Sequence, residues 1–123
     1  MWQLDHVQVA IPAGSEARCD DFYVGLLGFA IVEKPPVLAA RGGRWYLDGL
    51  ARVHLGVEAD FRPANRAHPA LLVEGYDALR ERLMNAGLDV RDDDAIEHER
   101  RCYVDDPVGN RLELIDAAAS LPR

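Results

Sequence analysis

Several features that would place a protein in a special class are missing from this sequence of 123 residues. It has two cysteines, Cys19 and Cys102, and neither has the spacing of a metal-binding or redox motif. Reduced thiols in a cytoplasmic protein are the simpler interpretation. No apolar run approaches the length of a membrane span, and the first residues lack the basic segment of a signal peptide. We therefore expect no membrane partner.

Basic residues are also fewer than acidic residues. The chain has 14 Lys and Arg against 21 Asp and Glu, which gives a formal net charge of −7. No basic stripe is available to meet phosphates, so we expect no nucleic acid partner. A length of 123 residues is enough for one compact domain or for two small modules that share a core. Apolar residues make up 49% of the chain, which is ordinary for a globular protein.

The first half of the chain has signals for one helix and four strands. Apolar and polar residues alternate from Val7 to Ile11, which predicts a strand over residues 4–12. A helix follows, with Ser15 as the expected N-cap and Gly28 as the expected C′ residue. Three further strands are expected over residues 29–34, 42–49 and 51–58.

The same order returns after a connector at residues 59–67. A strand is expected over residues 68–75, and a helix with Asp77 as its N-cap over residues 76–88. Three further strands are expected over residues 88–93, 100–106 and 110–116. The last residues, 117–123, are expected to form a loose tail.

Both halves therefore read strand–helix–strand–strand–strand, which indicates two copies of one supersecondary unit. We interpret residues 1–60 as a first βαβββ module and residues 61–123 as a second. The predicted fold class is α+β, in which the two modules pair into a curved mixed sheet with helices on its outer face. A homodimer is expected, because two short modules leave sheet edges that need covering.

Four side chains of metal-ligand type occupy corresponding strands of the two halves. His54 and Glu113 each lie between apolar neighbours that point the other way, and His6 and His68 lie off the apolar faces of the first strands. Three imidazoles and one carboxylate make a plausible ligand set for a divalent transition metal. A simply solvated strand face is the alternative, because polar residues on such a face need no special explanation.

Two motifs add a family resemblance. The segment FYVGLLGF at residues 22–29 resembles an F-Y-x-x-x-L-G-F helix end, and VDDPVGNRLELID at residues 104–116 resembles a D-P-D-G-N-x-x-E-L signature. Both are typical of the vicinal oxygen chelate superfamily, which includes glyoxalase I, bleomycin and fosfomycin resistance proteins, methylmalonyl-CoA epimerase and extradiol dioxygenases. The resemblance covers nearly the whole chain. It implies paired βαβββ modules that together form one glyoxalase-like domain.

The resemblance also implies a metal site formed by His6, His54, His68 and Glu113. Most enzymes of the superfamily take ligands from the positions of His6, His68 and Glu113, whereas the position of His54 varies and holds Glu in glyoxalase I. We therefore expect His54 to be a fourth ligand or a general base, and Glu113 to be a ligand that can also move a proton. The expected cofactor is a divalent ion of zinc, nickel, iron or manganese.

The predicted function is that of a small metal-dependent, glyoxalase-like enzyme of the lyase or isomerase type. Its metal ion would bind two vicinal oxygens of a small-molecule substrate. One alternative is a drug-binding protein without turnover, similar to the bleomycin resistance proteins, and another is ring cleavage of the extradiol dioxygenase type. In a homodimer, His6 and His54 of one chain would face His68 and Glu113 of the other.

Other polar residues are weaker candidates. Four arginines could hold an anionic substrate but are interpreted here as ordinary surface residues: Arg44, Arg62, Arg100 and Arg101. Trp45 and Tyr46 are neighbours on one expected strand, so one should pack in the core while the other lines the pocket.

Overall fold

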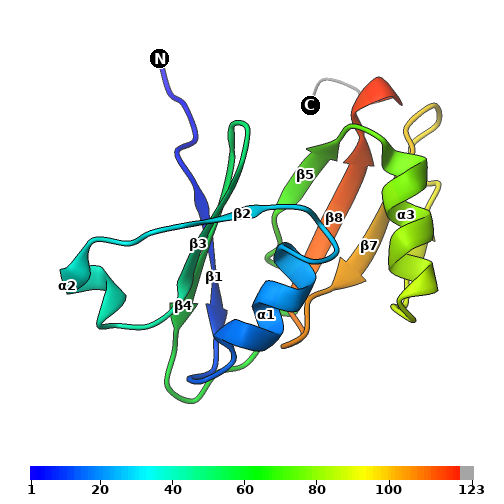
Figure 1. The fold of residues 1–123 in the computed structure, drawn as a ribbon. Helices are drawn as coiled ribbons and strands as arrows, with labels where there is room; N and C mark the ends of the chain where they lie inside the picture. The colour runs from blue at the N-terminus through cyan, green and yellow to red at the C-terminus, as the bar shows by residue number, and fades with distance from the viewer. Residues whose placement is uncertain (120–123) are drawn as a thin grey trace. The chain divides into compact units, whose positions relative to one another are not determined.

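The computed structural model describes residues 1–119, and the chain divides into two compact units, Met1–Pro63 and Ala64–Arg123. Residues 120–123, which end the predicted second module and its tail, lie outside the described residues. Each unit contains its own four-stranded mixed sheet (Figure 1). The predicted α+β class with two βαβββ-like modules is confirmed.

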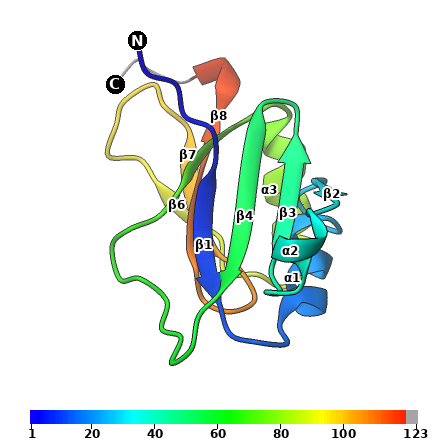
Figure 2. The same ribbon diagram turned by 90° about the vertical axis from the view of Figure 1, so that its left-hand side faces the viewer.

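The first unit contains a sheet in the order β1-β4-β3-β2, in which β1 runs parallel to β4 and the other pairs are antiparallel. Figure 2 shows β1, β4 and β3 side by side. Its elements are β1 (Val7–Ile11), α1 (Glu16–Tyr23), β2 (Ala30–Val32), α2 (Pro36–Ala39), β3 (Arg44–Asp48) and β4 (Ala51–Val57).

Helix α1 packs on one face of this sheet through aromatic and charged contacts. The rings of Tyr23 and Tyr46 stack with centroids 4.9 Å apart, and Tyr46 is 1% exposed. Asp20 accepts hydrogen bonds from the Tyr46 hydroxyl at 2.7 Å and from the Arg44 Nε at 3.0 Å. Arg44 therefore joins the helix to β3, and its guanidinium is already paired.

Ser15 is the N-cap residue of α1, as predicted. Its hydroxyl donates to the Pro12 carbonyl at 2.7 Å, however, and makes no cap bond to the helix. Helix α1 ends at Tyr23, before Gly28, and a bond of 2.9 Å from the Phe29 N–H to the Tyr23 carbonyl closes the following turn. The short helix α2 was not predicted, because four residues are too few to show a helical period.

The second unit contains a sheet in the order β5-β8-β7-β6, with β5 parallel to β8. Its elements are β5 (Ala70–Val73), α3 (Tyr76–Asn85), β6 (Arg91–Asp93), β7 (Arg101–Asp105), β8 (Arg111–Asp116) and the 3-10 turn η1 (Ala117–Ala119). The N-cap of α3 is Gly75, whose positive φ of 70° suits glycine, so the prediction of Asp77 is wrong. Asp77 lies in the first turn, where its charge favours the helix N-terminus.

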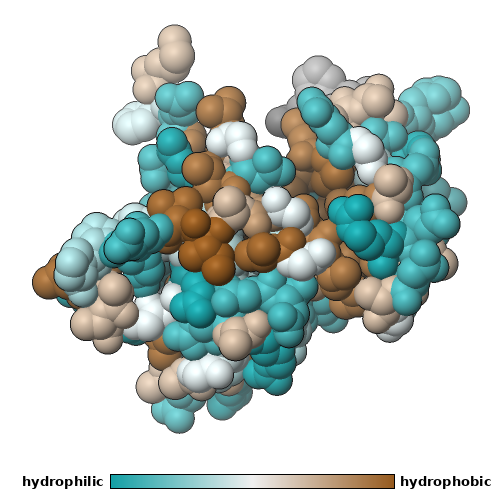
Figure 3. Space-filling view, in the orientation of Figure 1, coloured by the Kyte–Doolittle hydropathy of each residue, from teal (hydrophilic) through white to brown (hydrophobic). Residues whose placement is uncertain are grey.

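Helix α3 covers one face of the second sheet. It contacts β8, and its inner residues Leu79 and Leu83 are buried. The strands bury apolar side chains as well, namely Cys102, Val104, Leu112 and Leu114. The outward side of α3 is mostly hydrophilic (Figure 3). Alternation along β7 and β8 then places their remaining side chains on the face opposite α3.

Both cysteines, Cys19 and Cys102, are fully buried thiols, in agreement with the sequence interpretation. No helix within residues 1–119 is both long enough and apolar enough to cross a membrane. The cytoplasmic location stays a prediction.

Candidate functional site

Glu113 lies on the central strand of the second sheet. In the register of β8 it stands between Ala70 of β5 and Tyr103 of β7. Its neighbours Leu112 and Leu114 point to the side of α3, so Glu113 points to the opposite face. Only 6% of Glu113 is exposed, which is unusual for a carboxylate and requires hydrogen-bonding partners.

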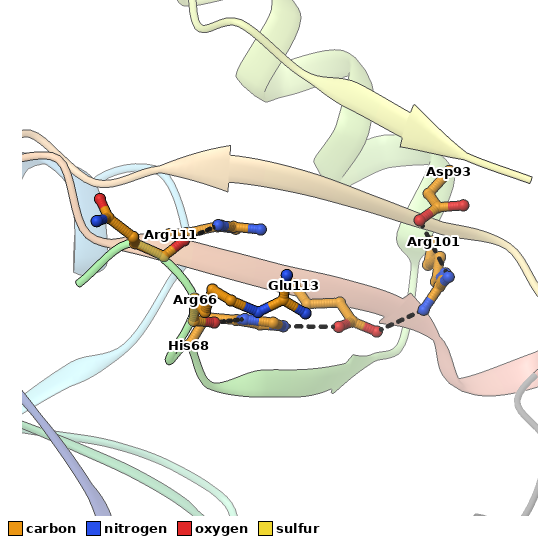
Figure 4. A network of polar contacts seen from close by, with 7 residues as sticks. Arg66, His68, Asp93, Arg101, Arg111 and Glu113 are labelled. Atoms are coloured by element: carbon orange, nitrogen blue, oxygen red, sulfur yellow. Dashed lines mark hydrogen bonds and ion pairs between the residues drawn. The ribbon is translucent and has the colours of Figure 1, made fainter. Parts of the chain in front are cut away.

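His68 is the first of these partners. It lies just before β5 rather than within it, and the Pro69 carbonyl accepts the Glu113 N–H at 3.0 Å. This backbone bond fixes His68 beside β8. The imidazole Nε2 lies 3.0 Å from Oε1 of Glu113, and Nδ1 lies 2.6 Å from the carbonyl oxygen of Arg66 (Figure 4).

These two contacts decide which nitrogen of His68 carries a proton. A carbonyl oxygen only accepts, so Nδ1 must donate to Arg66. In a neutral ring, Nε2 would then direct a lone pair at the Glu113 carboxylate. Two acceptors 3.0 Å apart need a cation between them, either a proton or a metal ion. The geometry therefore fits a cation-binding pair.

The donor set also fits a divalent metal. Histidine nitrogen and carboxylate oxygen bind zinc at about 2.0 to 2.2 Å, so two such atoms about 3 Å apart can reach one ion together. A histidine that binds metal typically donates its other N–H to a carbonyl or a carboxylate. His68 makes that second contact to Arg66.

Arg101 is the second partner of Glu113. Its NH1 donates to Oε2 of Glu113 at 3.3 Å and its NH2 to Oδ2 of Asp93 at 3.0 Å. Its side chain is 12% exposed, so the interpretation of Arg101 as an ordinary surface residue is wrong. The signal that could have found it is alternation, because Arg101 lies next to the buried Cys102 on a strand paired with β8.

The D-P-x-G-N motif positions this strand pair. Oδ1 of Asp106 accepts the backbone N–H groups of Val108 at 3.1 Å and of Asn110 at 2.8 Å. The Asn110 side-chain amide donates to the other Asp106 oxygen at 3.1 Å, and both residues are buried. The motif thus closes the β7–β8 turn and sets Glu113 opposite Tyr103.

The first unit brings together His6 and His54. Their rings stack with centroids 4.0 Å apart and planes inclined by 17°, and the other face of His54 stacks on Trp45 at 4.7 Å. Nδ1 of His6 lies 2.8 Å from Oδ2 of Asp5. Trp45 therefore lies on the face opposite α1 and Tyr46 in the core, as the alternation predicts.

The stack bears on the predicted role of His54. Burial, together with the nearby His6, lowers the pKa of His54 below its usual value, which favours the neutral ring. Nitrogen lone pairs lie in the ring plane, so an ion in the plane of one stacked ring lies outside the plane of the other. As the rings stand, His6 and His54 do not direct their lone pairs to one point.

The predicted ligands thus come together as two pairs, one in each unit. Within residues 1–119, no group of three or more His, Cys, Asp or Glu side chains has the arrangement of a metal site. The set His6, His54, His68 and Glu113 therefore stays a prediction. Of the weaker candidates, Arg44 pairs with Asp20, Arg100 pairs with Asp77, and Arg62 is exposed.

Comparison with known proteins places the chain in a family. The model of the glyoxalase-like domain matches residues 8–115. A crystal structure of a Bacillus anthracis protein assigned to the glyoxalase family is 42% identical, with a TM-score of 0.90, and the alignment covers 94% of this chain and 95% of that chain. A comparison with curated proteins finds no significant match.

Two more distant structures share the fold. The fosfomycin resistance protein FosX from Mesorhizobium loti is 19% identical with a TM-score of 0.68, over 94% of this chain and 92% of that chain. The antibiotic binding protein TnmS3 from Streptomyces sp. CB03234 is 24% identical with a TM-score of 0.67, over 94% of this chain and 98% of that chain. The chain belongs to the glyoxalase-like domain family of the vicinal oxygen chelate superfamily.

Proposed function

We propose that this protein is a small metal-dependent enzyme of the lyase or isomerase type. Its substrate is a small molecule with two vicinal oxygens, which a divalent metal ion binds. His68 and Glu113 are the central ligands, and His6 is a third. One observation carries the proposal: His68 donates from Nδ1 to a carbonyl while its Nε2 lies 3.0 Å from the Glu113 carboxylate.

The proposed ligands suit zinc, nickel, iron and manganese. When bound, the ion supplies Lewis-acid stabilisation of negative charge that develops on the substrate oxygens. Three protein ligands leave coordination positions for the substrate or for water, as a catalytic site requires.

Each protein group near the ligands has a definite task in this proposal. Arg101 holds Oε2 of Glu113 and leaves Oε1 directed at His68. Glu113 can also take a proton from the substrate on that carboxylate. Asp5 orients His6 through Nδ1, as a carboxylate commonly does for a metal-binding histidine.

For His54 we propose a positioning role. Its ring is stacked between His6 and Trp45 and so fixes the plane of the His6 ring. The alternative is the role predicted from the sequence, in which His54 is a fourth ligand or a general base. A substitution of His54 that keeps a flat ring but no nitrogen distinguishes the positioning role from this alternative.

Metal titration tests the proposal. The chelator-treated protein is titrated with zinc, nickel and manganese, and the Glu113→Gln and His68→Ala variants are compared with the wild type. We expect metal affinity to fall at least tenfold in both variants. His98→Ala is the matched control, because the His98 side chain is 84% exposed and lies in a loop. A wild type that binds no ion more tightly than Glu113→Gln would end the proposal.

The reaction class has its own readout. An activity that chelator removes and zinc or nickel restores without oxygen uptake supports lyase or isomerase chemistry. Restoration by iron with oxygen uptake would move the assignment to ring cleavage of the extradiol dioxygenase type.

A second candidate function is binding without turnover. The stack of His6, His54 and Trp45 favours it, because stacked rings offer a flat aromatic surface to a planar ligand. The antibiotic binding protein TnmS3 shares this fold. Tight binding of an aromatic drug that chelator leaves unchanged, with no product formed, would favour this candidate over the enzyme.

We also propose that the protein is a homodimer. Strands β1 and β2 are the edges of one sheet, and β5 and β6 are the edges of the other. Edge strands leave backbone groups available for a partner chain. Sedimentation of the metal-loaded protein as a monomer would contradict this part of the proposal.

A further inference from the structure

We infer that Arg111 binds an anionic group of the substrate, either a carboxylate or a phosphoryl-type group. The inference deepens the proposed function, on which it rests for the identity of the site. It narrows the substrate to acids that carry an oxyanion close to their vicinal oxygens.

Arg111 lies on the same face of the sheet as Glu113. The two residues are separated by one position on β8, so both point away from α3. Two residues along a strand span about 7 Å, which is within the reach of a small substrate. Tyr103 joins the two parts of the site, because its ring lies 5.7 Å from the Arg111 guanidinium and 5.6 Å from the His68 ring.

The charge of Arg111 is not neutralised by the described part of the chain. Among residues 1–119, no aspartate or glutamate forms an ion pair with Arg111. The other arginines of this face differ, because Arg101 pairs with Asp93 and Arg91 pairs with Asp105. An arginine without a carboxylate partner beside a catalytic pair is a candidate for pairing with a charged substrate.

Two contacts hold the guanidinium in place. Its NH2 donates to the backbone carbonyl of Asn65, and its central carbon lies over the Tyr103 ring, 5.7 Å from the ring centroid. Cation–π contact of this kind fixes the side chain without neutralising its charge. A positioned guanidinium offers parallel N–H donors that match two oxygens of a carboxylate or phosphate. The arrangement therefore selects an oxyanion over a neutral group.

The test uses inorganic phosphate and acetate as probes of the full chain. Amide NMR titrations are run on the chelator-treated protein and again with zinc present. We expect saturable shifts at Tyr103 and Arg111, and Arg111→Gln should weaken phosphate binding about tenfold or more, the range for a bond between charged groups. A stronger effect of phosphate than of acetate would indicate a phosphoryl-type substrate, and the reverse a carboxylic acid.

Arg91→Gln is the matched control, since it removes a paired arginine from the same face. It should leave phosphate binding within twofold of the wild type. Arg111→Lys keeps the charge but loses the parallel N–H donors of the guanidinium, so it should bind phosphate with intermediate affinity. This variant replaces Arg111→Gln in the test if Arg111→Gln does not fold.

Metal titration of Arg111→Gln separates the two proposals. Unchanged metal affinity with lost phosphate binding supports the inference. Phosphate binding equal to that of the wild type, or no saturable phosphate binding by the wild type in either form, overturns the inference. Failure of the proposed function would be seen instead as missing metal binding in the wild type.

Discussion

Nε2 of His68 lies 3.0 Å from Oε1 of Glu113, while the other ring nitrogen of His68 is committed to the Arg66 carbonyl. The two residues are far apart in the sequence and meet because β5 pairs in parallel with β8. Their contact requires a cation between a lone pair and a carboxylate. A proton or a metal ion can fill that position, and we propose that a divalent ion does.

The first prediction concerns His54. If His54 acts through stacking, His54→Phe keeps a flat ring between His6 and Trp45. Metal affinity should then fall less than fivefold, whereas His6→Ala should lose at least tenfold. Calorimetric titration of both variants with zinc gives the comparison. A large loss in His54→Phe equal to that in His6→Ala would make His54 a ligand.

Glu113→Gln should also destabilise the metal-free protein. The amide keeps the shape of the side chain but removes the charge that Arg101 and His68 contact. Because Arg101 is mostly buried, we expect the free energy of unfolding in urea to fall by about 1 to 3 kcal/mol.

A control for this change is available on the same sheet. Asp105→Asn breaks a more exposed ion pair with Arg91, and should cost less than about 1 kcal/mol. Equal losses in Glu113→Gln and Asp105→Asn would show that the Glu113 contacts are no stronger than surface pairs.

Asp106 should be important for stability although it touches no proposed ligand. Its carboxylate accepts three N–H groups from Val108 and Asn110. Asp106→Ala leaves those donors buried, so we expect the free energy of unfolding to fall by about 2 to 4 kcal/mol. Denaturant titration measures the loss. Asp89→Ala, at an exposed position, should change little, and an equal effect in the two variants would contradict the structural role of the turn.

Tyr46 should make stability depend on alkaline pH. Burial, followed by the hydrogen bond to Asp20, raises the pKa of Tyr46 above its unfolded value of about 10. Above about pH 10 the native state keeps a proton on Tyr46 that the unfolded state loses. The contribution of Tyr46 to the free energy of unfolding is therefore complete below about pH 10 and falls as the pH rises further.

For one such group, the free energy of unfolding should fall by about 1.4 kcal/mol for each pH unit. Tyr46→Phe should remove that contribution, as urea unfolding measured between about pH 9 and 11 would show. An unchanged slope in the variant would mean that Tyr46 ionises equally easily in the native protein.

Apart from the short helix α2, the order of elements and the faces of the strands could be predicted from the sequence. Alternation around Glu113 and His54 gave the correct outward direction, because buried neighbours on a strand determine where the next side chain points. The D-P-x-G-N turn was also found, since each residue type has a local conformational reason to be there.

Contacts between side chains on neighbouring strands could not be predicted from the sequence. The stack of His54 on Trp45 depends on their pairing across β3 and β4, and the burial of Arg101 depends on the β7–β8 register. Alternation fixes a direction but not a neighbour. Arg111 was not predicted as a site residue for the same reason, because its role rests on contacts with Asn65 and Tyr103.

The protonation of the His68 ring tests the central claim most directly. Long-range ¹H–¹⁵N correlation spectra distinguish protonated, lone-pair and metal-bound ring nitrogens before and after zinc is added. We predict that Nδ1 stays protonated throughout, as its bond to Arg66 requires, and that the Nε2 signal moves to the metal-bound position. The same spectra of the His98→Ala variant serve as the control, because this substitution should not change the response of His68 to zinc. An Nε2 signal of His68 that zinc leaves unchanged in both proteins would contradict the assignment of His68 and Glu113 as metal ligands.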